Sequence, residues 1–172
     1  LYVFYNNEYK KIEREIHMRI ILARHGETDY NKNKKVQGHS DIPLNEEGIR
    51  QGKEAGKKLE GHEIDVAYSS TLERAYDTAR YMLDNSNSEN NKNLSVIKDK
   101  RLIEKSYGGY EGVSFAEYGA GLKAGETRGM ELDTEAADRV EEFFKEKYNE
   151  HPDKTILAVC HGGLIRSFLT EK

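Results

Sequence analysis

The stretch MRIILARHG, residues 18–26, joins a short apolar run to an arginine, a histidine and a glycine. The run MRIILA (18–23) contains β-branched side chains and no charge after Arg19, which is typical of a strand buried on both faces. A solvated turn after such a strand is usually built from Asn, Asp or Ser. The sequence Arg24-His25-Gly26 therefore indicates that this strand ends at a site with a chemical role.

Strands and helices alternate along the rest of the chain. Short apolar runs predict strands at 65–69, 95–99 and 155–160, and apolar periodicity predicts helices at 46–60, 71–85, 134–150 and from 164 onward. The sequence has no internal repeat and no domain linker. We therefore expect an α/β fold with one domain over residues 1–172, in three layers: a mostly parallel central sheet with helices on both faces.

Local signals refine this prediction. Asn45 is expected to cap the helix at 46–60, and the spacing of Ser70 and Glu73 predicts a capping box that opens the next helix. The polar run NSNSENNKN (85–93) is predicted to be a loop with nothing to bury. Residues 105–131 are rich in glycine, so we expect irregular structure with a short helix near 114–118.

Composition excludes several classes of protein. The 27 basic and 31 acidic residues are interspersed and give a net charge of −4, which argues against a nucleic-acid partner. The single Cys160 excludes an internal disulfide and is expected to pack in the core. No apolar run approaches the roughly 20 residues that span a bilayer, so we expect a cytoplasmic protein with no membrane contact. Four histidines lack metal-ligand spacing and are expected to be solvated, so no metal is predicted: His17, His39, His62 and His151.

Basic and imidazole side chains follow three of the predicted strands. Arg24 and His25 follow the first, Arg74 stands in the first turn after the second, and His161 follows the last. In such sheets ligands bind beyond the carboxyl ends of the strands. Guanidinium groups match phosphate oxygens, and a neutral imidazole can accept a phosphoryl group as a nucleophile. These residues therefore predict a phosphoryl-transfer site, although an ordinary solvated Arg74 is the alternative.

A leaving oxygen also requires a proton. Glu104 follows an apolar pair and precedes a glycine-rich bend, where it can serve as the general acid. Glu27 and Glu111 stand in the same motifs and are the alternatives. The run Lys32–Lys35 is interpreted as a solvated face, with attraction of anionic substrates as the second possibility.

Residues 18–166 resemble the histidine phosphatase superfamily, which contains the cofactor-dependent phosphoglycerate mutases. Four segments carry the resemblance in the family's order: RHGET (24–28) with Asn31 and Gln37-Gly38, the SSTLERA segment (69–75), Glu104 with GYEG (109–112), and HGG (161–163) followed by Arg166. Tyr110 stands where the family usually has Trp. Members usually continue for some tens of residues beyond the second histidine motif, whereas this sequence ends at Lys172. The sequence therefore does not decide how the domain is completed after that motif.

The resemblance implies a phosphoglycerate mutase-like fold and a role for each motif residue. His25 would be the phosphorylated nucleophile, flanked by Arg24, Arg74 and His161, with Glu104 as proton donor. The phosphate or substrate pocket would be lined by Asn31, Gln37, Gly38, Tyr107 and Gly162. No metal and no nucleotide are expected.

The leading hypothesis is a metal-independent phosphomonoester hydrolase whose partner is a small phosphorylated metabolite. The chemistry as far as the phosphohistidine is shared with a mutase, which would need 2,3-bisphosphoglycerate as cofactor. An inactive scaffold that only binds a phosphorylated ligand is the third alternative. Residues 1–17 are either an accessory element or sequence upstream of a start at Met18, and their YVFY run (2–5) leaves a homodimer open.

Overall fold

A five-stranded sheet forms the centre of the molecule, seen in a computed structural model that describes the backbone of residues 3–6 and all of residues 18–172. The strand order is β1-β2-β5-β3-β4. The four strands β2 (Arg19–Arg24), β5 (Thr155–Cys160), β3 (Val66–Ser69) and β4 (Val96–Lys98) are parallel, and β1 (Val3–Asn6) is antiparallel to β2 at the edge. The predicted mostly parallel α/β sheet is confirmed. The homodimer hypothesis concerned side chains of residues 1–17, which lie outside the described residues.

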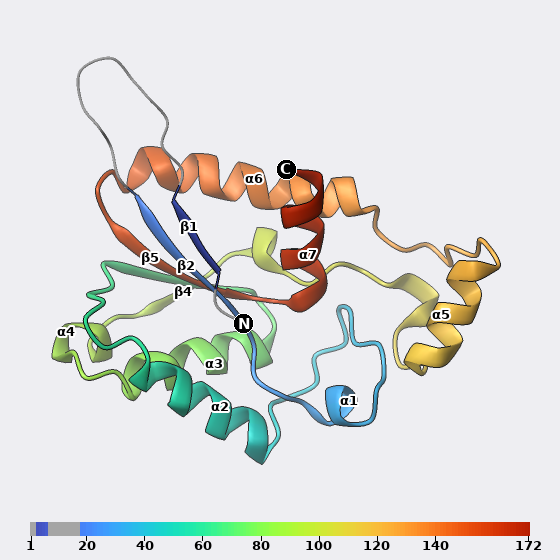
Figure 1. Ribbon diagram of the computed structural model, residues 1–172, viewed down its shortest axis with the longest axis horizontal. Coiled ribbons are helices and arrows are strands. Elements are labelled where there is room, and N and C mark those ends of the chain that lie inside the picture. Colours follow the sequence, from blue (N-terminus) through green and yellow to red (C-terminus); the bar gives the residue numbers. More distant parts are fainter. Residues whose placement is uncertain (1–2, 7–17) are drawn as a thin grey trace.

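Helices cover both faces of the sheet, as Figure 1 shows. The helices α2 (Glu46–Lys57) and α3 (Glu73–Asp84) lie on one face, and α6 (Asp133–Glu150) and α7 (Gly162–Glu171) on the other. Successive side chains of a strand point to opposite faces, so a sheet covered twice requires an apolar residue at nearly every position. This requirement explains the uninterrupted apolar runs IILA (20–23) and ILAVC (156–160).

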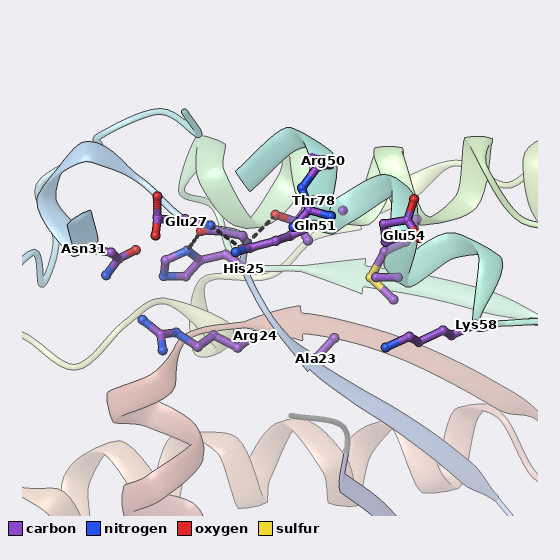
Figure 2. A pocket seen from close by; sticks show the side chains of 14 residues that line it. Ala23, Arg24, His25, Glu27, Asn31, Arg50, Gln51, Glu54, Lys58 and Thr78 are labelled. Atoms are coloured by element: carbon purple, nitrogen blue, oxygen red, sulfur yellow. Dashed lines mark hydrogen bonds between the residues drawn. The ribbon is translucent and has the colours of Figure 1, made fainter. Parts of the chain in front are cut away.

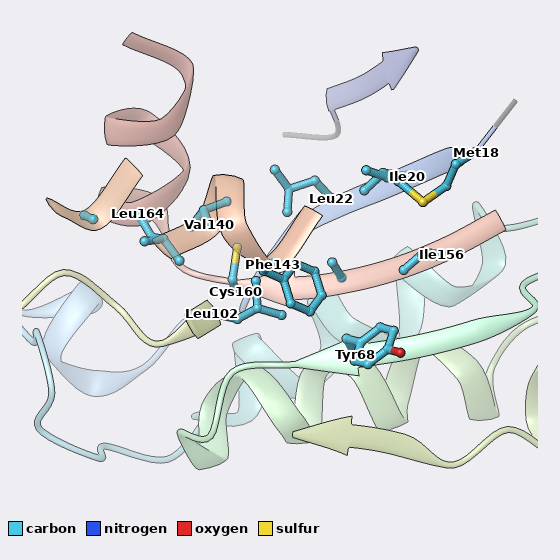
Figure 3. Packing of buried hydrophobic residues seen from close by; sticks show 12 residues of the cluster. Met18, Ile20, Leu22, Tyr68, Leu102, Val140, Phe143, Ile156, Cys160 and Leu164 are labelled. Carbon is cyan, nitrogen blue, oxygen red and sulfur yellow. The ribbon is translucent and has the colours of Figure 1, made fainter. Parts of the chain in front are cut away.

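Two apolar clusters fill the spaces between sheet and helices. On the α6 side, Ile20, Leu22 and Ile156 pack with Phe143 of α6 and Leu164 of α7 (Figure 3). The opposite cluster takes the alternate strand positions and packs them against α3: Ile21, Ala23, Leu157 and Val159 with Ala75, Ala79 and Met82. Cys160 is buried in the first cluster, as expected, and burial raises the pKa of its thiol to about 12.

The start of α3 differs from the prediction. Leu72, and not Ser70, is the N-cap residue, and no side chain of this segment caps the helix. The predicted capping box is therefore wrong. Asp41 supplies the cap instead, because its Oδ1 accepts a hydrogen bond from the Glu73 N–H at 2.9 Å. The Ser70 hydroxyl accepts a hydrogen bond from the Leu72 N–H and does not cap the helix.

The polar run 85–93 is also different from the prediction. It contains a one-turn helix, α4 (Glu89–Lys92), capped by Ser88, and its Asn91 is fully buried. Asn91 Oδ1 accepts from the Ile64 N–H at 2.8 Å, and its Nδ2 donates to the His62 carbonyl and the Ser86 hydroxyl. The segment therefore buries a polar side chain that satisfies backbone groups ahead of β3.

The remaining elements lie beyond the carboxyl ends of the strands, where Figure 1 shows α1 (Asp29–Lys32) and α5 (Phe115–Lys123). Two short 3₁₀ turns, η1 (Lys100–Leu102) and η2 (Gly108–Tyr110), precede α5. The helix predicted near 114–118 thus exists and is longer than expected. Among residues 18–172, no helix has the length and apolar character needed to cross a membrane.

Candidate active site

The two motif histidines meet at the carboxyl ends of neighbouring strands. In the parallel pairing of β2 and β5, Arg24 stands opposite Cys160, so His25 and His161 follow at the same level. Their ring centroids are 5.1 Å apart. His161 is the N-cap residue of α7, and this helix begins at Gly162, two residues earlier than the sequence suggested.

His25 is held in one orientation. Its Nδ1 donates to the Gly26 carbonyl oxygen at 2.6 Å, which leaves Nε2 with its lone pair free for chemistry. The Gly26 N–H donates to the Thr78 hydroxyl of α3 at 3.0 Å. A side chain at Gly26 would collide with the carbonyl of Gly48, which explains the glycine of the RHG motif.

The imidazole of His25 is neutral over most of the accessible pH range. Its pKa is lowered to about 3 by burial and by the nearby charges of Arg74 and Arg24, although the bond to Gly26 opposes the shift. A neutral ring with Nε2 unprotonated is the nucleophilic form.

Arg74 reaches the site from α3 and is fully buried. Its two terminal nitrogens donate to the carbonyls of Ser40 and Gly38, at 2.7 and 2.8 Å. Its Nε has no hydrogen-bond partner, and the same is true of both ring nitrogens of the buried His161. These three are the buried side-chain nitrogens without a partner in the described part of the chain. Buried polar groups are normally paired, so their occurrence in one place indicates a site for a polar ligand.

Glu104 approaches the same site from the loop after β4. Its Oε1 accepts from the Leu164 N–H at 2.8 Å and its Oε2 from the Gly163 N–H at 3.1 Å, at the amino end of α7. This is the favourable end of a helix for an anion. The backbone carbonyl of Glu104 accepts from Arg139 of α6 and from His39 Nε2, at 3.2 and 2.8 Å. His39 is exposed, as the sequence suggested, and its ring also supports the backbone of the site.

A cavity of about 550 Å³ opens onto these groups. It is lined by eight of the ten residues predicted for the site: Arg24, His25, Asn31, Gln37, Gly38, Glu104, Tyr107 and Gly162. Arg74 and His161 do not line it, because they are buried beneath it. The lining also includes Lys35, Phe115, Tyr118 and Arg166, which were not predicted as site residues. Phe115 and Tyr118 stand one helical turn apart, and this spacing is the sequence signal that could have indicated these two residues.

The two predicted amide side chains are both oriented by Thr28. Its hydroxyl lies 3.2 Å from Asn31 Oδ1 and 2.8 Å from Gln37 Oε1. The amide oxygens are thus turned toward Thr28, which leaves the NH₂ groups as donors toward the cavity that both residues line. Tyr107 is also buried, and burial raises its pKa, so its hydroxyl remains protonated.

A second cavity, of about 630 Å³, begins at His25 and runs along α2 to Lys58, as Figure 2 shows. It shares Arg24, His25 and Asn31 with the first cavity but contains neither Glu104 nor the start of α7. Nearby Glu27 accepts from Asn45 Nδ2 at 2.9 Å, which gives it a structural role. Of these two cavities, the smaller one therefore brings together His25 and Glu104, the residues predicted as nucleophile and proton donor.

Known proteins resemble this chain in sequence and in structure. Residues 20–171 match the family model of the histidine phosphatase superfamily, branch 1. An uncharacterised phosphatase, PhoE, of Bacillus subtilis is 33% identical over 152 residues, which cover 88% of this chain and 76% of that protein. A 2,3-bisphosphoglycerate-dependent phosphoglycerate mutase of Treponema denticola is 41% identical over 102 residues, 58% of this chain and 40% of the mutase.

Solved structures give the same result. A mycobacterial glucosyl-3-phosphoglycerate phosphatase complexed with VO3 superposes with a TM-score of 0.77 at 30% identity, covering 87% of this chain and 79% of that one. A phosphoserine phosphatase of Entamoeba histolytica, in complex with 3-phosphoglyceric acid, gives 0.75 at 27% identity, covering 90% and 80%. With the family match over residues 20–171, these findings establish that the chain belongs to the histidine phosphatase superfamily, branch 1.

Proposed function

We propose that this protein is a metal-independent phosphomonoester hydrolase that acts on a small phosphorylated metabolite through a phosphohistidine at His25. One observation carries the proposal. The neutral, oriented His25 lies in a cavity with Arg24, next to three buried nitrogens of Arg74 and His161 that have no partner. A phosphoryl group offers acceptor oxygens for the Arg74 Nε–H and for the single N–H of a neutral His161 ring.

In the first step, Nε2 of His25 would attack phosphorus in line with the ester oxygen. The N–P bond forms as the P–O bond breaks, and Glu104 donates a proton to the leaving oxygen. Arg24, Arg74 and His161 would stabilise the charge on the equatorial oxygens, which is the main catalytic requirement of phosphoryl transfer.

In the second step, water would attack the phosphohistidine. Glu104 accepts the proton of the water as the N–P bond breaks, and inorganic phosphate leaves. Both His25 and Glu104 then return to their starting protonation states, so the cycle closes without a metal ion.

The mutase alternative differs only in the second acceptor, a sugar acid in place of water, with 2,3-bisphosphoglycerate as cofactor. The phosphatase PhoE is similar over 152 residues at 33% identity, and a 2,3-bisphosphoglycerate-dependent mutase of Staphylococcus epidermidis is similar over 152 residues at 31%. The extent of the similarity is thus the same for both activities, and the second acceptor is what distinguishes them. Conversion between 2- and 3-phosphoglycerate in the presence of the cofactor, with no phosphate release, would favour the mutase.

The test is phosphate release from p-nitrophenyl phosphate in EDTA, comparing wild type with His25→Ala. We expect turnover in EDTA and at least about a thousandfold loss in the variant, because the covalent step cannot occur without the imidazole. His62→Ala is the matched control, since His62 lies ahead of β3 at the opposite end of the strands. Activity that survives His25→Ala would show that the nucleophile is another residue.

A further inference from the structure

The loop of residues 38–41 connects three parts of the site. Its Gly38 and Ser40 carbonyls accept the two terminal nitrogens of Arg74. The ring of His39 donates to the Glu104 carbonyl, and Asp41 caps α3, the helix that carries Arg74. Whatever fixes this loop therefore fixes the guanidinium that the proposed reaction requires.

The carboxylate of Glu111 fixes this loop. Its Oε1 accepts from the His39 N–H at 2.9 Å, and its Oε2 accepts from the Ser40 N–H and the Ser40 hydroxyl, both at 3.0 Å. It also lies against Gly38, which has a φ of +55° and no room for a side chain, because a Cβ there would collide with Glu111. The loop thus folds around one carboxylate from a segment more than 70 residues away.

Glu111 does not fit the role of proton donor, for which it was an alternative to Glu104. It is absent from the residues that line the cavity, whereas Glu104 lines it together with His25. Its negative charge is nevertheless close enough to favour the charged form of the buried Arg74, as do Glu104 and Asp41.

We infer that Glu111 is a positioning residue for the phosphate site. It orients the Gly38 and Ser40 carbonyls, which hold the guanidinium of Arg74 in place beneath the cavity, with its Nε unpaired. The inference rests on the proposed function, since it assigns Arg74 to the phosphoryl group. It gives a role to the acidic residue of the GYEG motif, which the mechanism itself does not use.

The first test measures the affinity for inorganic phosphate by calorimetry and kcat/KM for p-nitrophenyl phosphate. Glu111→Gln keeps the size of the side chain but replaces one acceptor oxygen by an NH₂ group that cannot accept. We expect about a tenfold loss in both quantities, the size of one weakened charge-assisted contact. Glu117→Gln is the matched control, because Glu117 is exposed on α5 and pairs only with Arg128 among the ion pairs of the described residues. It should change both quantities by less than twofold.

The second test separates positioning from a general structural effect. In an Arg74→Lys background the bidentate contact with the two carbonyls is already lost, so Glu111→Gln should cost less than a further twofold. If the same tenfold loss recurs there, Glu111 acts independently of Arg74 and the inference is wrong. An unchanged phosphate affinity in Glu111→Gln alone would also overturn it. Should that variant fold poorly, Ser40→Ala removes one of the three bonds and should give a smaller loss in the same direction.

Measuring phosphate binding separately from hydrolysis distinguishes a failure of the proposed hydrolase from a failure of the inference about Glu111. A wild type that binds phosphate but hydrolyses no ester counts against the hydrolase and leaves Glu111 testable by affinity. A wild type that hydrolyses the ester with Glu111→Gln fully active counts against the inference alone. A wild type that does neither would overturn both.

Discussion

Glu104 Oε1 accepts a hydrogen bond from the Leu164 N–H at 2.8 Å, so the first turn of α7 holds the carboxylate of a segment 60 residues earlier in the chain. His161 stands at the cap of the same turn. One helix end therefore sets the positions of the proposed proton donor and of His161, which is proposed to contact the phosphoryl group.

Gly163→Ala should disturb the proton donor selectively. A Cβ at this position would collide with the Tyr107 hydroxyl and come within 2.8 Å of Glu104 Oε1. A displaced acid matters most for poor leaving groups, so we expect kcat for an alkyl phosphate such as glycerol 2-phosphate to fall about 10²-fold or more. The rate for p-nitrophenyl phosphate, which leaves without protonation, should fall far less.

The control is Gly119→Ala, because no atom lies within 4 Å of a Cβ built at Gly119. Equal losses for the two esters in Gly163→Ala would contradict a role of Glu104 as general acid.

Lys35 should contribute to substrate affinity and not to the chemical step. It lines the cavity, and its Nζ lies 5.5 Å from the ring centroid of Tyr30. Lys35→Ala should raise KM severalfold for a phosphorylated ester that carries a second anion, with kcat unchanged. The increase should shrink at 0.5 M salt, since the side chain is exposed and its charge is screened. The control is Lys32→Ala, on the same basic run but outside the cavity lining, which should leave KM unchanged. An equal rise of KM in both variants would indicate that the positive charge of the whole run, and not Lys35 itself, attracts the substrate.

The sequence predicted the parts of this site that depend on strand ends. Apolar runs located β2 and β5, and parallel pairing then required His25 and His161 to be neighbours. The roles of Asp41 and Glu111 could not be predicted, because both act through long-range contacts between a side chain and the backbone. Asp41 caps a helix 32 residues away, and Glu111 fixes a loop more than 70 residues away. Local propensity contains no signal for such contacts, because the partner N–H groups exist at every position.

Asn91 makes the long-range contacts with the backbone that we expect to matter most for stability. The variant Asn91→Ala leaves the buried Ile64 N–H without its acceptor and removes two further hydrogen bonds. We expect a loss of about 2–4 kcal/mol in the free energy of unfolding. Urea denaturation measures it, and Asn90→Ala, an exposed position in the same helix, should cost less than about 1 kcal/mol. Similar losses in both variants would mean that helix propensity, and not burial, governs the segment.

His25, the proposed nucleophile, should also make the stability of the phosphate-free protein dependent on pH. The pKa of His25 is lowered from 6.5 to about 3 in the folded state, chiefly by burial. Between these values the unfolded chain binds a proton that the folded chain does not, so stability falls as the pH falls through 6.5. From pH 7 to pH 5 the contribution of this one group to the free energy of unfolding is about 2 kcal/mol.

His25→Asn lacks the titrating ring, so its free energy of unfolding should decline by about 2 kcal/mol less than that of wild type over this interval. Urea denaturation at the two pH values measures the difference, with His62→Asn as control. Parallel declines in wild type and His25→Asn would show that the imidazole takes up its proton without unfolding, and would remove the argument that His25 is neutral in the resting site.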